Sequence, residues 1–151
     1  MLPLPGTETI LAVDHDNAVL RLTQSILTFY GYTVIGADSG EKALELFAVE
    51  PEITVDLLLV DIVMPGMNGP ETVDHIWKLR PGLPALYCSG YSGKEFLWPE
   101  IARKVSYLAK PFTAFQLTKG IREMLERSTA PSSTYSSTMP DSSPRTVGSQ
   151  K

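Results

Sequence analysis

The sequence predicts an α/β fold in which five parallel strands form a doubly wound sheet with helices on both faces. Three observations predict it. Short apolar runs alternate with segments of helical periodicity along the chain. Polar residues follow several of these runs directly. The run at 55–61 is almost continuously apolar, as in a strand buried on both faces of a parallel sheet. A chain of 151 residues has room for one such domain with an ordinary core.

The first predicted strand is 9–13, and a helix follows it. Asp16 or Asn17 can cap that helix, because their side chains accept bonds from the free backbone amides at a helix start. Gly31 suits its end. The inward face of this helix is predicted to consist of Val19, Leu22, Ile26, Leu27 and Tyr30.

A second strand is predicted at 32–35, followed by a short helix that Ser39 caps and Pro51 ends. The helix carries Ala43, Leu44 and Phe47 on its apolar side. The third strand, 55–61, ends on an acid, Asp61, which therefore lies at the carboxyl end of a central strand. Open α/β sheets place their chemistry at that edge, and a carboxylate buried there needs a partner.

The next helix opens at 69–70, where proline fits the first turn, and ends at 81–82. Its inward residues are predicted to be Val73, Ile76 and Trp77. A fourth strand is predicted at 84–88. Residues 93–104 are predicted to be irregular, with a short helix from about Pro99.

The fifth predicted strand is 105–109. Thr113 and Gln116 form a capping box for the last helix, whose inward residues are Leu117, Ile121, Met124 and Leu125. Right-handed crossovers and one reversal of winding predict the strand order 2-1-3-4-5, which is the flavodoxin-like topology.

The chain divides into three predicted regions. Residues 1–7 are rich in Pro and Gly and are expected to be loose, and 8–127 form the domain. Residues 128–151 are rich in Ser, Thr and Pro and are expected to be a disordered tail, because they cannot bury enough apolar surface to offset the entropy of ordering.

Composition limits the classes of function. A net charge of −4 argues against general nucleic-acid binding. No apolar run approaches the roughly 20 residues of a membrane span, and the start of the chain lacks a signal-peptide pattern, so no membrane role and a cytoplasmic location are expected. Cys88 is the single cysteine, which excludes an internal disulfide, and it is expected to be buried.

Polar side chains at strand ends are expected to converge on one edge of the sheet. They are Asp14, His15, Asp16, Asp61, Ser89 and Lys110. Clustered carboxylates repel one another, and a hard divalent cation such as Mg²⁺ relieves that repulsion. A phosphoryl group on Asp61 would have Mg²⁺ and Lys110 as electrostatic partners and Ser89 as a hydrogen-bond partner, which are the groups that phosphoryl transfer needs.

Four segments carry a resemblance to a known family: 10–14 (ILAVD), 56–69 (DLLLVDIVMPGMNG), 89–91 (SGY) and 110–112 (KPF). Across about 8–127 the chain resembles the receiver domain of bacterial two-component response regulators, and the second segment is highly specific for it.

The resemblance implies a role for each matching residue. Asp61 is the implied phosphoacceptor, taking a phosphoryl group from a histidine of a sensor kinase or a phosphotransfer protein. Asp14, Asp61 and the backbone carbonyl of Val63 are the implied Mg²⁺ ligands. Ser89 and Tyr107 are the implied switch residues. Lys110 is implied to pair with the phosphoryl group, and the peptide bond that follows it is implied to be cis.

The chain departs from the family pattern at His15, where receivers usually carry a second acid that binds Mg²⁺. Imidazole is a poor Mg²⁺ ligand and a better one for transition metals. Three interpretations stay open. Asp16 or a water takes the place of the acid and Mg²⁺ binding is weakened. His15 points away and the chain is a pseudo-receiver, a phosphorylation-independent interaction module. His15 binds Mn²⁺, Zn²⁺ or a similar ion.

Output is expected through protein contact at the face made by 93–127, because no DNA-binding or catalytic pattern follows residue 127. Aromatic and apolar residues that can serve such a contact are Phe96, Leu97, Trp98 and Phe115. Val63 cannot orient an attacking water and Tyr91 could shield the site, so loss of the phosphoryl group by hydrolysis is expected to be slow.

Two competing classes fit less well. Residues 14–16 resemble the Asp-x-Asp motif of haloacid-dehalogenase-type phosphatases, but those enzymes need a further acidic pair after the lysine, and 111–127 lack one at a strand end. A flavodoxin-like FMN carrier would need a hydroxyl-rich loop after the first strand. We therefore expect a phosphoacceptor rather than an enzyme with turnover.

Overall fold

The computed structural model describes residues 2–90 and 105–129, and these form a parallel sheet in the order β2-β1-β3-β4-β5. The predicted fold class and strand order are confirmed. The predicted helix near Pro99 and residues 96–98 lie outside the described residues. The elements are β1 (Thr9–Val13), α1 (Asn17–Phe29), β2 (Thr33–Ala37), α2 (Gly40–Val49), β3 (Leu57–Asp61), α3 (Gly69–Leu79), β4 (Ala85–Ser89), β5 (Val105–Ala109) and α4 (Ala114–Thr129).

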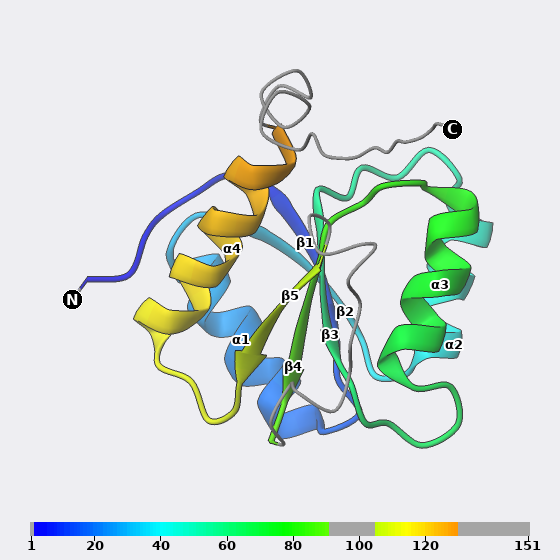
Figure 1. Cartoon of the computed structure of the whole chain (residues 1–151), viewed down its shortest axis with the longest axis horizontal. Helices are drawn as coiled ribbons and strands as arrows, with labels where there is room; N and C mark the ends of the chain where they lie inside the picture. The colour runs from blue at the N-terminus through cyan, green and yellow to red at the C-terminus, as the bar shows by residue number, and fades with distance from the viewer. Residues whose placement is uncertain (1, 91–104, 130–151) are drawn as a thin grey trace, which may run out of the picture.

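Helices cover both faces of the sheet, with α1 and α4 on one side and α2 and α3 on the other (Figure 1). Successive residues of β1 face opposite layers, as a period of two requires. Ile10 belongs to the buried cluster that contains Leu117 and Ile121 of α4, whereas Leu11 belongs to the cluster that contains residues of α2 and α3. β3 lies between β1 and β4 and all five of its residues are buried, so its carboxyl end emerges at the centre of the site edge.

Local capping sets where the helices begin. Asp16 caps α1 and Ser39 caps α2 by accepting hydrogen bonds from amides of the first turn. Asn68 and Glu71 form a reciprocal capping box at the start of α3, and Thr113 and Gln116 form the predicted one before α4. No helix in the described part of the chain is both long and apolar enough to cross a membrane.

The inward face of α1 differs from the predicted one. Leu20, Thr23 and Leu27 are buried, at spacings of three and four residues. Leu22 is 59% exposed, so its predicted place in the core is wrong. The reason is that a threonine occupies the centre of the buried stripe. Because this residue is polar, apolar periodicity alone does not indicate which face of the helix is buried.

The ends of the domain also differ from the predictions. Residues 2–8 have no regular secondary structure, but Leu4 N donates to Thr118 Oγ1 and Gly6 N donates to the Tyr30 carbonyl. Glu8 accepts a 2.6 Å bond from Arg122 on α4. The segment expected to be loose is therefore held against the layer of α1 and α4. At the other end α4 continues to Thr129, past the predicted boundary at 127.

Gly69 connects the fold to the site. It is buried at the first position of α3, and a Cβ atom there would meet the backbone carbonyl of Asp61 and would lie 2.9 Å from Ile62 Cα. Its amide donates to the Ile62 carbonyl at 2.8 Å. The start of α3 thus packs directly on the backbone that carries Asp61.

Replacing Gly69 tests this contact. Gly69→Ala is expected to lower the free energy of unfolding by about 1–3 kcal/mol, since the added methyl group forces the two backbones apart. Urea unfolding measures the change. Gly90→Ala is the control, because a Cβ at Gly90 meets nothing within 4 Å, and it should change stability by less than about 0.5 kcal/mol. Equal stability of the Gly69 variant and the unchanged protein would contradict the close contact.

Candidate functional site

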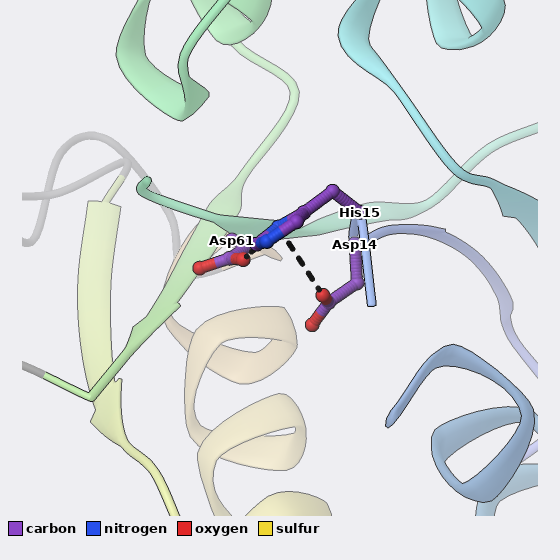
Figure 2. A group of neighbouring side chains, drawn as sticks. All are labelled: Asp14, His15 and Asp61. Carbon is purple, nitrogen blue, oxygen red and sulfur yellow. Dashed lines mark hydrogen bonds and ion pairs between the residues drawn. The ribbon is translucent and has the colours of Figure 1, made fainter. Parts of the chain in front are cut away.

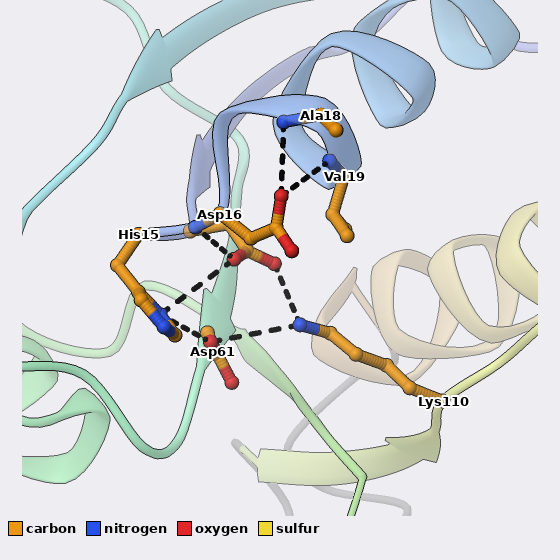
Figure 3. A network of polar contacts seen from close by, with 7 residues as sticks. His15, Asp16, Ala18, Val19, Asp61 and Lys110 are labelled. Carbon is orange, nitrogen blue, oxygen red and sulfur yellow. Dashed lines mark hydrogen bonds and ion pairs between the residues drawn. The ribbon is translucent and has the colours of Figure 1, made fainter.

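The carboxyl ends of three parallel strands bring the central charged residues of the site together. Asp14 follows β1, Asp61 ends β3 and Lys110 follows β5. The sheet register places Val13 beside Val60 and Asp61 beside Cys88, which sets these ends at one level. Figure 3 shows the resulting network of polar contacts.

Lys110 lies against both buried carboxylates. Its Nζ is 2.8 Å from Asp14 Oδ2 and 3.5 Å from Asp61 Oδ2. The side chain of Asp61 is 5% exposed and that of Asp14 is 10% exposed. One ammonium group therefore serves two carboxylates in a region largely closed to water, where uncompensated charge is costly.

Burial and neighbouring charges change the pKa values of Asp61 and Lys110. Burial raises the pKa of Asp61, and the nearby Asp14 carboxylate raises it further, against the opposing effects of Lys110 and His15. For Lys110, burial alone would lower the pKa, but the hydrogen bond and charge of Asp14 and the charge of Asp61 hold the pKa above its ordinary value. Lys110 is thus firmly protonated, while Asp61 carries its negative charge in an unfavourable environment.

His15 points into the site. Its Nδ1 lies 3.1 Å from Asp61 Oδ2 and 3.9 Å from Asp14 Oδ1 (Figure 2), and its side chain is 45% exposed. The interpretation in which His15 points away does not match this geometry. His15, Asp14 and Asp61 each offer one ligand atom, and these atoms lie within 4.8 Å of one another.

Asp16 faces the start of α1. Its Oδ1 accepts bonds from the amides of Ala18 at 3.0 Å and Val19 at 3.2 Å (Figure 3). Its own amide donates to Asp14 Oδ1 at 2.9 Å, which fixes the orientation of the Asp14 carboxylate. Asp16 is therefore engaged in capping, and its suggested place among the metal ligands stays a prediction.

The remaining predicted site residues lie around this centre. Ser89 is the last residue of β4 and is buried, with its carbonyl accepting from the Lys110 amide at 2.8 Å. The peptide bond between Lys110 and Pro111 is cis. Tyr107 is half-buried on β5, and the Val63 side chain is 46% exposed just beyond Asp61. Tyr91 lies outside the described residues.

A small cavity lies against the two carboxylates. Its volume is about 10 Å³, and its lining includes Thr23, Cys88 and Phe112. A space of this size holds at most about one water, so larger groups can reach Asp61 only from the solvent side of the edge. Neither Thr23 nor Phe112 is predicted to line the site. Phe112 belongs to the KPF segment, and its position two residues after Lys110 could have indicated that it lies near the site.

The donor set, two carboxylates and one imidazole, fits a divalent cation. Two carboxylates share one lysine, so the group carries excess negative charge that a cation can neutralise. Asp14 and Asp61 offer carboxylate oxygens, which are the ligands that Mg²⁺ prefers. His15 supplies a nitrogen where an oxygen would suit Mg²⁺ better.

Comparison with known proteins places this site in a family. A family model described as the response regulator receiver domain matches residues 10–122. The chain therefore belongs to the response regulator receiver domain family.

Relatives in this family include sensor kinases and transcriptional regulators. The chain is 37% identical over 126 residues to Sensor kinase CckA of Brucella abortus (strain 2308), covering 82% of this chain and 13% of that protein. It is 34% identical over 120 residues to Transcriptional regulatory protein CpxR of Escherichia coli (strain K12), covering 79% of this chain and 50% of that protein. The chain thus spans half or less of the length of these relatives.

Solved structures agree with this assignment. The receiver domain of the hybrid histidine kinase CckA superposes with a TM-score of 0.65 at 31% identity, covering 78% of this chain and 98% of that one. A CheY-like receiver domain protein from Methanospirillum hungatei JF-1 gives a TM-score of 0.69 at 33% identity, covering 82% and 97%.

The unfavourable charge on Asp61 leads to a stability prediction. Asp61→Asn is expected to raise the free energy of unfolding by about 1 kcal/mol at about pH 7.5 in EDTA, because the neutral amide removes the repulsion. The folded protein holds the Asp61 proton more tightly than the unfolded chain does. Stability of the unchanged protein therefore falls as pH rises from the ordinary carboxyl pKa through the raised one.

Urea unfolding of both proteins across this range measures the difference. The advantage of Asp61→Asn should be largest near neutral pH and should disappear at low pH, where Asp61 is protonated in both folded and unfolded states. Asp74→Asn, an exposed site on α3, is the control and should change stability by less than about 0.5 kcal/mol. A loss of stability in Asp61→Asn near neutral pH would contradict the prediction.

Proposed function

We propose that this chain is the phospho-receiver of a two-component phosphorelay, in which Asp61 accepts a phosphoryl group from a histidine of a sensor kinase or a phosphotransfer protein. One observation carries the proposal. The Asp61 carboxylate is buried at the centre of the site edge with Lys110 Nζ 3.5 Å from one of its oxygens. A developing phosphoryl charge at this position has a fixed cation beside it.

The transfer forms one bond and breaks one. An Asp61 carboxylate oxygen bonds to phosphorus, while the bond from phosphorus to the imidazole nitrogen of the donor breaks and its electron pair stays on that nitrogen. Lys110 stabilises the charge on the phosphoryl oxygens. Ser89, buried at the end of the neighbouring strand, donates a hydrogen bond from its hydroxyl group to one of the phosphoryl oxygens.

A resident Mg²⁺ would be held by the carboxylates of Asp14 and Asp61 and by the backbone carbonyl of Val63. When bound, it supplies positive charge that offsets the excess carboxylate charge of the site and that of the incoming phosphoryl group. His15 weakens this Mg²⁺ site because it removes an oxygen ligand, and Mn²⁺ is the alternative ion. Asp16 remains a candidate ligand if it leaves the α1 cap.

The signal leaves through protein contact. Movement of Ser89 toward the phosphoryl group changes the space beside Tyr107 and shifts the equilibrium between two arrangements of the surface formed by β5 and α4. A downstream protein in the cytoplasm binds this surface and distinguishes its two arrangements. Phe115, half-buried on α4, is one aromatic residue of this surface.

A second candidate function is a pseudo-receiver that binds partners without phosphorylation. The observation that favours it is the 3.1 Å contact between His15 Nδ1 and Asp61 Oδ2. A side chain in this position occupies an oxygen of the phosphoacceptor and stands where a cation would approach.

Phosphorylation by a small acyl phosphate separates the two functions. With Mg²⁺ or Mn²⁺ present, the intact mass should rise by one phosphoryl group, and Asp61→Asn should abolish the gain. Asp56→Asn is the matched control, since Asp56 precedes the same strand at its opposite end and accepts a bond from the Thr9 amide. No gain with either metal would support the pseudo-receiver.

The lifetime of the phosphorylated state gives a further prediction. Hydrolysis is slow because Val63, exposed beside Asp61, cannot hydrogen-bond to an attacking water. Val63→Asn should speed loss of the phosphoryl group at least threefold, though by less than the roughly 100-fold of full general acid–base assistance. Loss of mass over time measures the rate, and Val49→Asn, on the exposed end of α2, should leave it unchanged. An unchanged rate in Val63→Asn would contradict the proposed cause.

A further inference from the structure

His15 offers a nitrogen ligand at the centre of the charged group. The residue follows Asp14 directly in the loop after β1, and its Nδ1 faces the two carboxylates (Figure 2), while its side chain is 45% exposed. Two oxygens and one nitrogen from Asp14, Asp61 and His15 lie within 4.8 Å of one another. This donor set differs in kind from a set made only of oxygens.

The spacing of these atoms suits direct coordination. Ligand atoms bound to one small dication at about 2.0–2.2 Å lie roughly 3.0–3.5 Å from one another. The distance from His15 Nδ1 to Asp61 Oδ2 is 3.1 Å, and the distance to Asp14 Oδ1 is 3.9 Å. The third distance, between the Asp14 and Asp61 oxygens, is at most 4.8 Å. Coordination of one ion by all three atoms therefore requires the two carboxylates to turn toward each other, together with a rotation of the imidazole ring.

Lys110 does not block such an ion at Asp14. The lysine contacts Oδ2 of Asp14, whereas His15 faces Oδ1 of the same carboxylate. The Asp16 amide bonds to Oδ1 as well and keeps this oxygen turned toward the His15 side. The two oxygens of Asp14 are thus divided, with Oδ2 toward Lys110 and Oδ1 toward His15.

We propose that this site selects a first-row divalent transition-metal ion over Mg²⁺, with Asp14, Asp61 and His15 Nδ1 as its protein ligands. Mg²⁺ prefers oxygen ligands and near-ideal octahedral geometry. Imidazole binds first-row transition metals well, and mixed carboxylate and imidazole sites follow the affinity order that rises from Mn²⁺ toward Cu²⁺. The inference rests on the proposed function only in placing a cation beside Asp61, and it makes His15 the residue that determines which cation is used.

Calorimetric titration of the unphosphorylated full chain tests the selectivity. The quantity is the ratio of the dissociation constant for Mg²⁺ to that for Mn²⁺. His15→Asp should lower this ratio by about tenfold or more, because a carboxylate replaces the nitrogen ligand. His75→Gln is the matched control, since His75 is the other histidine of the chain and is exposed on α3. It should leave the ratio unchanged, and an unchanged ratio in His15→Asp would overturn the proposal.

Electron spin-echo envelope modulation of bound Mn²⁺ tests the bond itself. The unchanged protein and His75→Gln should both show modulation from a directly bound imidazole nitrogen-14. His15→Gln and His15→Asp should lose it. Absence of the nitrogen signal in the unchanged protein, or its persistence in both His15 variants, would overturn the assignment of His15 as a ligand.

These outcomes are distinct from a failure of the proposed function. Both measurements use unphosphorylated protein and do not depend on transfer to Asp61. A nitrogen-ligated Mn²⁺ in a chain that no acyl phosphate modifies would support the metal site and contradict the phospho-receiver. Phosphorylation at Asp61 with unaltered metal selectivity in His15→Asp would support the phospho-receiver and contradict the metal site.

Discussion

Lys110 contacts two buried carboxylates at once, and the arrangement of the sheet makes that contact possible. Asp14 and Lys110 are 96 residues apart in the sequence and meet because β1 and β5 run parallel on either side of β3 and β4. The two apolar layers hold the strands in register, and the packing of Gly69 on the Asp61 backbone fixes the height of the central acid. One ammonium for two carboxylates leaves negative charge that a cation or a partner must balance.

Much of the site could be predicted because a parallel sheet gathers the ends of its strands. The places of Asp14, Asp61 and Lys110 at the ends of apolar runs predict that they converge, and Lys110 Nζ lies within 3.5 Å of both carboxylates. The direction of His15 could not be found this way. A residue in a loop after a strand obeys no period, so its side chain orientation depends on contacts that the order of amino acids does not reveal.

The sequence predicts the fold well where a local rule, such as capping, determines an element. It predicts less well the features that tertiary packing determines. Apolar runs and capping residues gave the elements and their order. The buried face of α1 was misassigned because Thr23 lies at its centre. The close approach at Gly69 and the bonds that hold Leu4 and Gly6 join segments distant in sequence, and such contacts leave no periodic signal.

Cys88 pairs with Asp61 in the sheet register and is 4% exposed, which gives the molecule a native reporter beside Asp61. Burial raises the pKa of its thiol, so in the closed form the thiol is shielded from alkylating reagents and is also kept in its less reactive protonated state. Reaction requires local opening between β3 and β4. Because the chain has a single cysteine, the rate of thiol labelling measures the free energy of that opening, without any engineered probe, in each metal-bound or phosphorylated state.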